Sequence, residues 1–268
     1  MTRLSRRPPA YGGRYRGRVA VVTGASQGLG AQLCLDLARA GATVVGLARN
    51  AERLDALALT LRALSPTSRT VVCDVADTAA LRAALAGIAE SEGPIDLLIN
   101  NAAQDPGVRL ADITEEDFRH TFDVNFFGPV VAMLAVLPAM VARGTGIIVN
   151  VSSDGGRLPS PGPGAYPSSK AALSALTEST YFRLKTKGVR VHVVYPAFMR
   201  TALGIGALRR GLRQPPRVTI RSVETVSQTI LTRAGESTLQ ISASRVIDAA
   251  MVFRQVLPRA YFWGRKGW

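Results

Sequence analysis

The sequence predicts an α/β fold, a doubly wound parallel sheet flanked by helices in a single domain. Strand patterns alternate with helical patterns along the chain, and no obvious linker interrupts them. A glycine-rich turn joins the first strand to the first helix. With 268 residues, 47% of them hydrophobic, the chain can bury one substantial core.

The first strand, turn and helix carry the glycine motif. Residues 18–22 (RVAVV) predict a buried strand, residues 23–30 read TGASQGLG, and a helical pattern runs to about Ala40. Gly24, Gly28 and Gly30 permit a tight turn and let main-chain amides approach a pyrophosphate at the helix N-terminus. An ordinary glycine-rich turn is the alternative, but a second strand at 42–48 favours a Rossmann-type dinucleotide site.

The remaining elements follow from periodicity and turn residues. Leu54, Leu57, Leu61 and Leu64 recur at helical spacing after Asn50, a suitable N-cap. The apolar stretch 130–142 predicts a core helix, because it is too short to span a membrane and is broken by Pro138. Further helices are expected over about 78–91, 112–127, 223–232 and 245–257, and strands over 70–73, 95–99, 146–151, 189–195 and 238–241.

Tyr166 and Lys170 are spaced four residues apart where a helical pattern begins. Residues with this spacing share one helix face, so the phenol and the ammonium can reach the same small region of a site. A nearby cation favours the phenolate and lowers the pKa of tyrosine from about 10, toward useful proton transfer. Alone, the spacing is also typical of a surface pair.

Several motifs together resemble the short-chain dehydrogenase/reductase family over about residues 17–201. They are the TGxxxGxG pattern at 23–30, Asn100-Asn101-Ala102 after a strand, Asn125, Ser153 thirteen residues before Tyr166, and Lys170. The resemblance implies a sheet of about seven strands. It also implies hydride transfer between a nicotinamide and a carbonyl or secondary alcohol, here of an apolar substrate. Ala103 and Ala197 depart from the family, which usually has glycine at both positions.

The resemblance also implies roles for individual residues. Tyr166 would be the general acid or base, and Lys170 would lower its pKa and bind the nicotinamide ribose. Ser153 would orient the substrate, and Asn125 would hold a relay water, with a buried capping asparagine as the alternative. The candidate cofactor-binding residues are Gly24, Ser26, Gln27, Gly28, Leu29, Gly30, Arg49, Asp74, Val75, Asn101, Ala102, Tyr166, Lys170, Pro196 and Thr201. No metal site is expected.

The end of the second strand bears on the cofactor. Ala48 stands twenty residues past Gly28, with Arg49 next. An apolar residue followed by a cation favours NADP(H) over NAD(H), although NAD(H) stays open and Arg49 could be a plain surface arginine. Asp74 would accept from the adenine amino group by resemblance, or could cap a turn.

The charge divides the chain. The sequence holds 33 basic and 19 acidic residues, a net charge of +14, and its basic excess lies in residues 1–18, 207–222 and 252–268. We expect a flexible basic arm at 1–16, a catalytic domain at 17–243 with a substrate lid at about 202–222, and an amphipathic basic and aromatic extension at 244–268. The arm is either solvated or in contact with an anion. The extension packs in a core or subunit interface, or contacts an anionic membrane.

Composition also bears on compartment and partners. Cys34 and Cys73 read as reduced thiols, and no apolar signal segment stands at the N-terminus, so a cytoplasmic protein is expected, with peripheral membrane association as the alternative. No nucleic-acid reading motif accompanies the arginines, so no specific nucleic-acid partner is expected. We expect instead a homo-oligomer that acts on a small carbonyl or alcohol substrate. A non-catalytic NADP(H)-binding sensor or scaffold would have a damaged catalytic set, whereas all four residues are present.

Overall fold

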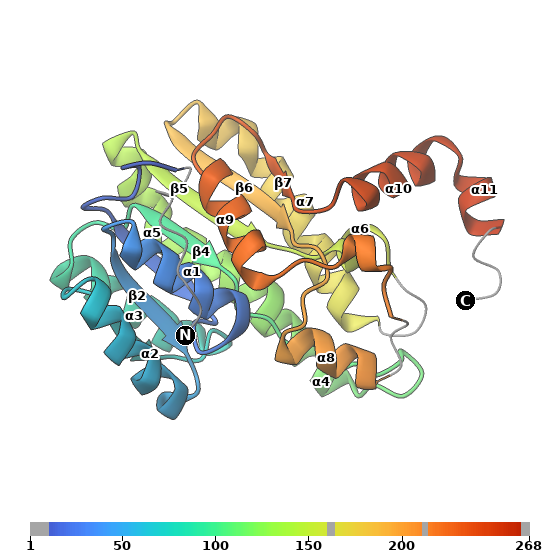
Figure 1. Ribbon diagram of the computed structural model, residues 1–268, viewed down its shortest axis with the longest axis horizontal. Coiled ribbons are helices and arrows are strands. Elements are labelled where there is room, and N and C mark those ends of the chain that lie inside the picture. Colours follow the sequence, from blue (N-terminus) through green and yellow to red (C-terminus); the bar gives the residue numbers. More distant parts are fainter. Residues whose placement is uncertain (1–10, 160–163, 211–213, 264–268) are drawn as a thin grey trace.

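The computed structural model describes residues 11–159, 164–210 and 214–263, which form one seven-stranded parallel sheet with helices on both faces (Figure 1). The strand order is β3-β2-β1-β4-β5-β6-β7. This confirms the predicted fold class. The strands are β1 (Val19–Thr23), β2 (Thr43–Ala48), β3 (Arg69–Val72), β4 (Leu97–Asn100), β5 (Gly146–Val151), β6 (Val189–Tyr195) and β7 (Gln240–Ser242).

Most helices begin at the polar residues that the sequence offers as caps. Asn50 accepts the main-chain N–H of Arg53 at 2.8 Å, and Asp77 and Ser222 cap in the same way. The helices are α1 (Gly28–Arg39), α2 (Ala51–Leu64), α3 (Thr78–Ser91), α4 (Glu115–Phe122), the π-helix η1 (Asp123–Phe127), α5 (Gly128–Arg143), α6 (Asp154–Arg157), α7 (Ala165–Lys185), α8 (Ala202–Arg209), the 3₁₀-helix η2 (Arg217–Thr219), α9 (Val223–Arg233), α10 (Arg245–Val256) and α11 (Pro258–Trp263).

The sheet separates two apolar layers. Helices α1, α2 and α9 bury apolar side chains with one face of the sheet, and α3 and α5 do so with the other. The strand order reverses between β1 and β4, and the chain leaves these two strands for opposite faces, to α1 on one and to α5 on the other. In doubly wound sheets ligands bind at such a reversal, so the topology itself fixes the place of a site.

Helices α4, η1 and α5 form one continuous helix over Glu115–Arg143, which is long and apolar enough to cross a membrane by length and composition. Half of its most apolar window is buried, and α5 contacts α3, β4 and β5, as expected of a core helix. The predicted break at Pro138 is absent, because α5 continues through it. Proline costs one intrahelical bond, to the carbonyl of Leu134, and Leu134 lies on the exposed side.

The described residues before β1 differ from the predicted flexible arm. Tyr11 and Tyr15 are buried, edge to face at 5.4 Å, and the Tyr15 hydroxyl donates to the carbonyl oxygen of Leu231 at 2.6 Å. Arg14 donates to the carbonyl oxygens of Thr232 and Ala234. The two rings supply apolar area that a prediction based on arginine, proline and glycine content overlooked. Residues 1–10 lie outside the described residues.

Candidate active site

The glycine turn is held against the strand beside it. The Thr23 hydroxyl accepts the main-chain N–H groups of Asn101 and Ala102, each at 3.0 Å, and the Asn101 side chain donates to the carbonyl of Thr23 at 3.0 Å. Gly24 has φ +68°, and a Cβ there would lie 2.7 Å from the Ala102 Cα. A Cβ on Gly30 would lie 2.1 Å from the Gly24 carbonyl oxygen. Only glycine fits at either position.

This turn suits a pyrophosphate. Gln27 is the N-cap residue of α1, and its side chain makes no hydrogen bond to the first N–H groups of the helix. These N–H groups therefore stay open to a ligand at the start of the helix. Such a helix N-terminus attracts anions through its free N–H groups and its dipole. The residues present therefore fit a dinucleotide.

A cleft of about 340 Å³ runs from this turn across the carboxyl ends of the strands. Every predicted cofactor-binding residue lines it except Gly30, which is buried beneath the turn and serves its packing. Ala103, the departure from the family pattern, lines it too. Sequence reasoning missed several lining residues, namely Asn50, Arg53, Cys73, Val124, Val151, Ser152, Met199, Ala202 and Leu203.

One end of the cleft is basic. Arg49 lies 3.5 Å from the Asp74 carboxylate, which also accepts the main-chain N–H of Ala76 at 3.0 Å, as expected of the turn role. Arg53 donates to the side-chain carbonyl of Gln27. A signal for Arg53 was present in the sequence: it lies three residues after the capping Asn50, in the first turn of α2, where a side chain can reach the mouth of the cleft.

Tyr166 lines the cleft and meets Ser153, which lies outside the lining. Ser153 is the N-cap of α6 and accepts the main-chain N–H of Gly155 at 3.0 Å, and it shares a side-chain hydrogen bond with the Tyr166 phenol. Burial raises the pKa of Tyr166 to about 12, an effect that the Ser153 bond opposes and that the carboxylates of Asp105 and Asp154 reinforce. The phenol is therefore held as the acid at neutral pH.

Lys170 lies one turn further along α7 and is fully buried. Its ammonium donates to the carbonyl oxygen of Val151 at 2.8 Å, and burial lowers its pKa to about 7. That Lys170 lowers the pKa of Tyr166 stays a prediction. The ammonium is engaged with the main chain, and burial dominates the titration of both groups.

Asn125 lies in the π-helix η1, a type of helical irregularity that is frequent at functional sites. Its side-chain carbonyl accepts from the Gln104 main-chain N–H at 2.8 Å, and its amide donates to the Gln104 carbonyl oxygen at 2.8 Å and to the Ser169 hydroxyl at 3.0 Å. Protein groups thus occupy this buried amide, and the relay water stays a prediction. The amide braces the loop after β4 against α7.

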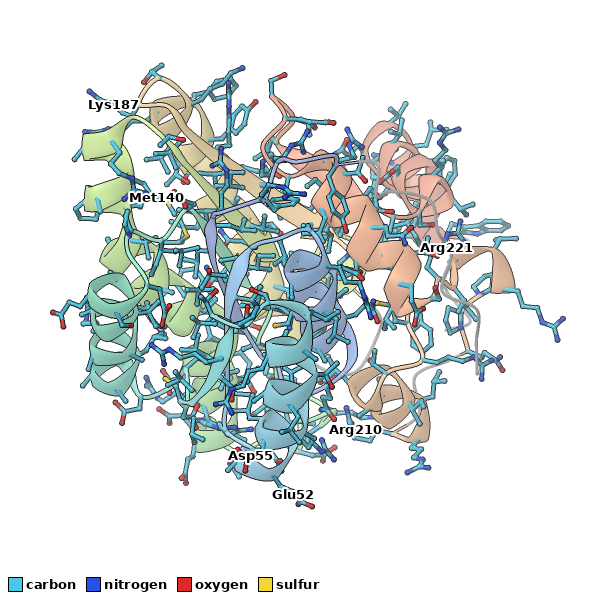
Figure 2. The ribbon with its side chains drawn as sticks, turned by 60° about the vertical axis from the view of Figure 1, so that its left-hand side comes forward. Glu52, Asp55, Met140, Lys187, Arg210 and Arg221 are labelled. Atoms are coloured by element: carbon cyan, nitrogen blue, oxygen red, sulfur yellow. The ribbon has the colours of Figure 1, made fainter. Side chains whose placement is uncertain are left out.

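Directly before the predicted lid at about 202–222, Thr201 caps α8 by accepting the main-chain N–H of Gly204 at 3.3 Å. Arg210 follows α8 and lies 3.3 Å from Asp105 in the loop after β4, so an ion pair joins the lid to the opposite side of the cleft. Figure 2 shows Arg210 beside this helix. The Asp105 carboxylate also raises the pKa of Tyr166, so the partner of Arg210 acts electrostatically on this phenol. Residues 211–213 lie outside the described residues.

Known proteins share this sequence and arrangement. A family model described as short chain dehydrogenase matches residues 18–208. Oxidoreductase UcpA of Salmonella typhimurium is 36% identical over 205 residues, covering 76% of this chain and 78% of that protein. A short-chain dehydrogenase/reductase from Burkholderia phymatum, solved with NAD, is 27% identical with a TM-score of 0.82, covering 92% and 95% of the two chains. A metagenomic short-chain oxidoreductase solved with NADP is 28% identical with a TM-score of 0.71, covering 85% and 96%.

Proposed function

The chain belongs to the short-chain dehydrogenase/reductase family and is an oxidoreductase of that type, and on this premise we propose that it uses NADP(H) to interconvert a carbonyl and a secondary alcohol. The observation that carries the proposal is that one cleft joins the glycine turn after β1 to Tyr166 and Lys170 on α7. A nicotinamide cofactor laid along such a cleft would bring its two ends to chemically different groups.

The chain's own residues supply the proton and orient the substrate oxygen. When bound, a nicotinamide supplies or accepts the hydride. Tyr166 holds a proton on its hydroxyl at neutral pH, because its pKa is about 12, and donates it to a carbonyl oxygen during reduction. Ser153, already within hydrogen-bond reach of that phenol, donates to the same oxygen. Met199 and Leu203 line the cleft with apolar surface, which supports an apolar substrate.

Lys170 lies on the same helix as Tyr166, four residues further along α7. Its pKa of about 7 lets the amine exchange a proton near neutrality, on the same helix face as the phenol. Its bond to the Val151 carbonyl fixes the end of the side chain beside β5. In the oxidative direction a protonated Lys170 would favour the phenolate that must form.

The preference for NADP(H) rests on the basic end of the cleft. Arg49 and Arg53 both line it, and a 2′-phosphate carries more negative charge than the ribose hydroxyl it replaces. Arg49 is paired with Asp74 at 3.5 Å, and both side chains are substantially exposed, so this pair contributes about 0–1 kcal/mol and can be exchanged for a phosphate.

A titration tests the proposal. The emission of NADPH and of NADH is followed as each binds the purified protein, and the titration is repeated with Arg49→Asp. We expect NADPH to bind at least about tenfold more tightly than NADH, and Arg49→Asp to abolish or reverse the preference. Equal binding, or tighter binding of NADH, would overturn the cofactor preference and leave the family assignment intact. Binding of neither would speak against both the enzyme and the NADP(H) sensor, and would favour a scaffold.

A further inference from the structure

The two C-terminal helices project from the body of the protein (Figure 1). Neither α10 nor α11 contains a buried residue. Two polar contacts attach α10 to α6: the Asp248 carboxylate lies 3.1 Å from the Arg157 guanidinium, and Arg254 donates to the carbonyl oxygen of Arg157. The helix therefore presents its opposite side outward.

That opposite side is apolar. Val246, Ala250, Phe253 and Leu257 recur at intervals of four, three and four residues, so they share one stripe of the helix. The exposed fractions of Val246, Phe253 and Leu257 are 49%, 44% and 52%. An amphipathic helix on a globular protein normally turns this stripe to the core. Here Ile247 and Met251 are partly buried, but much of the apolar surface of α10 still lies outside, with Val252 and Val256 exposed by 59% and 69%.

Helix α11 extends this surface with aromatic rings. Tyr261 lies 6.4 Å from Phe253 and 5.3 Å from Phe262, measured between ring centroids. Phe262 and Trp263 are exposed, Trp263 by 73%. Aromatic rings of this kind are enriched where a protein meets the headgroup region of a bilayer, since one part of the ring prefers the apolar side and another the wet side.

The C-terminal part of the sequence is strongly basic. Residues 200–268 contain twelve basic and three acidic side chains in the sequence, against 21 and 16 in the rest of the chain. Arg245 and Arg259 accompany the apolar stripe, and Figure 2 shows Arg210 and Arg221 in the lid region, whereas the acidic Glu52 and Asp55 stand out from α2. Contact with a second copy through this face would bring like charges together. An anionic bilayer complements it, at about 1 kcal/mol for each cation near the surface.

We propose that α10 and α11 form a docking surface for an anionic lipid bilayer. Phe253, Leu257, Phe262 and Trp263 enter the boundary between headgroups and acyl chains, and the arginines remain among the headgroups. This mode of attachment combines buried apolar area with attraction to anionic lipid, so it needs both. It does not depend on the cofactor or the reaction.

Vesicle binding tests the proposal with the full-length protein. Sedimentation with phosphatidylcholine vesicles is compared with sedimentation when part of the lipid is phosphatidylserine, at low and at high salt. We expect binding only to the anionic vesicles, weakened at least about tenfold by about 0.5 M salt. Both tryptophans of the chain, Trp263 and Trp268, lie in the C-terminal extension, so their emission should shift to shorter wavelength on binding.

Matched variants distinguish binding through this surface from non-specific adsorption to vesicles. Phe253→Ser combined with Leu257→Ser should reduce binding to anionic vesicles at least about tenfold, because the apolar contribution is removed. Leu59→Ser is the control: Leu59 is 72% exposed on α2, far along the chain from the extension, and its loss should change nothing. Circular dichroism verifies that all variants are folded.

Three results would overturn the proposal. They are no binding to anionic vesicles at low salt, equal loss in the control variant, and vesicle binding that the double variant retains. In a different outcome, the original protein does not bind vesicles and sediments as an oligomer, whereas the double variant sediments as a monomer. The surface would then be assigned to contact with a second copy of the chain.

Discussion

Arg157 on α6 and Asp248 on α10 form an ion pair at 3.1 Å, which ties the C-terminal extension to the turn that follows Ser153. Arg157 is the central member: its side chain is 9% exposed, it also pairs with Asp154 at 3.2 Å, and its guanidinium lies 3.7 Å from the centre of the Tyr195 ring. Because Ser153 is the N-cap of α6, the same guanidinium supports a candidate catalytic side chain and the base of the extension.

The two members of this pair should differ in importance. Arg157→Ala leaves Asp154 in a buried place without its partner, so we expect about 2–4 kcal/mol loss in the free energy of unfolding. Asp248→Ala, which removes a half-exposed carboxylate, should cost about 1 kcal/mol or less. Urea unfolding measures both, and Glu236→Ala, from the exposed pair with Arg233, is the control with almost no effect. Equal losses in the first two variants would contradict the central place of Arg157.

Removing the phenol tests the proton donor. Tyr166→Phe keeps the ring in place but removes the hydroxyl that meets Ser153, so turnover of a confirmed substrate should fall about 10²- to 10⁴-fold. The affinity for NADPH should change less than about threefold, because the phosphates bind at the far end of the cleft. Steady-state rates and the fluorescence titration provide the two readings. Full activity in this variant would disprove the assignment.

The buried amine of Lys170 should make stability depend on pH. Its pKa is about 7 in the folded protein and near 10.5 when unfolded, so between these values the unfolded chain binds more protons. The free energy of unfolding should therefore rise with pH above about 7, with a slope of at most about 1.4 kcal/mol per pH unit from this group. Below pH 7 both states are protonated and this contribution is flat.

The contribution of Lys170 can be isolated by difference. Urea unfolding of the protein without added cofactor is compared with that of Lys170→Met from pH 6 to pH 9. The original protein should gain stability relative to the variant as the pH rises from 7 to 9. A constant difference across this range would show that the amine titrates far from neutrality.

Arg53, which sequence reasoning overlooked, should help to choose the cofactor. Arg53→Ala removes one of two guanidinium groups at the basic end of the cleft, so NADPH should bind about tenfold more weakly while NADH is little affected. Arg62→Ala, at the end of the same helix α2, removes an exposed arginine outside the cleft lining and serves as control. A loss that is equal for both cofactors would point to helix capping or packing instead of 2′-phosphate recognition.

The fold and most of the cleft could be predicted because residues close together in the sequence determine them. Gly24 and Gly30 stand where any Cβ would collide, and the spacing from Ser153 to Tyr166 spans one loop between β5 and α7. Electrostatics could not be predicted in the same way. The pKa of Tyr166 depends on burial and on Asp105, which lies 61 residues away along the chain, and no spacing rule encodes that contact.

The N-terminal segment shows a second limit of sequence patterns. The stretch before β1 has the arginine, glycine and proline content of a tail, yet Tyr15 is completely buried and donates to Leu231, 216 residues away. Composition describes the whole segment, whereas two aromatic rings within it are enough to hold residues 11–16 against α1 and α9.

Two variants of Tyr15 measure how much the segment contributes to stability. Tyr15→Phe should cost about 1–2 kcal/mol, since it removes the 2.6 Å bond and leaves a buried carbonyl without that donor. Tyr15→Ala should cost about 3–5 kcal/mol, because it also leaves a cavity in the layer formed with α9. Urea unfolding gives both values, and Arg16→Ala, an exposed neighbour, is the control. If Tyr15→Ala were as stable as the original protein, the segment would behave in solution as the solvated tail that its composition suggests, and β1 would mark the start of the folded domain.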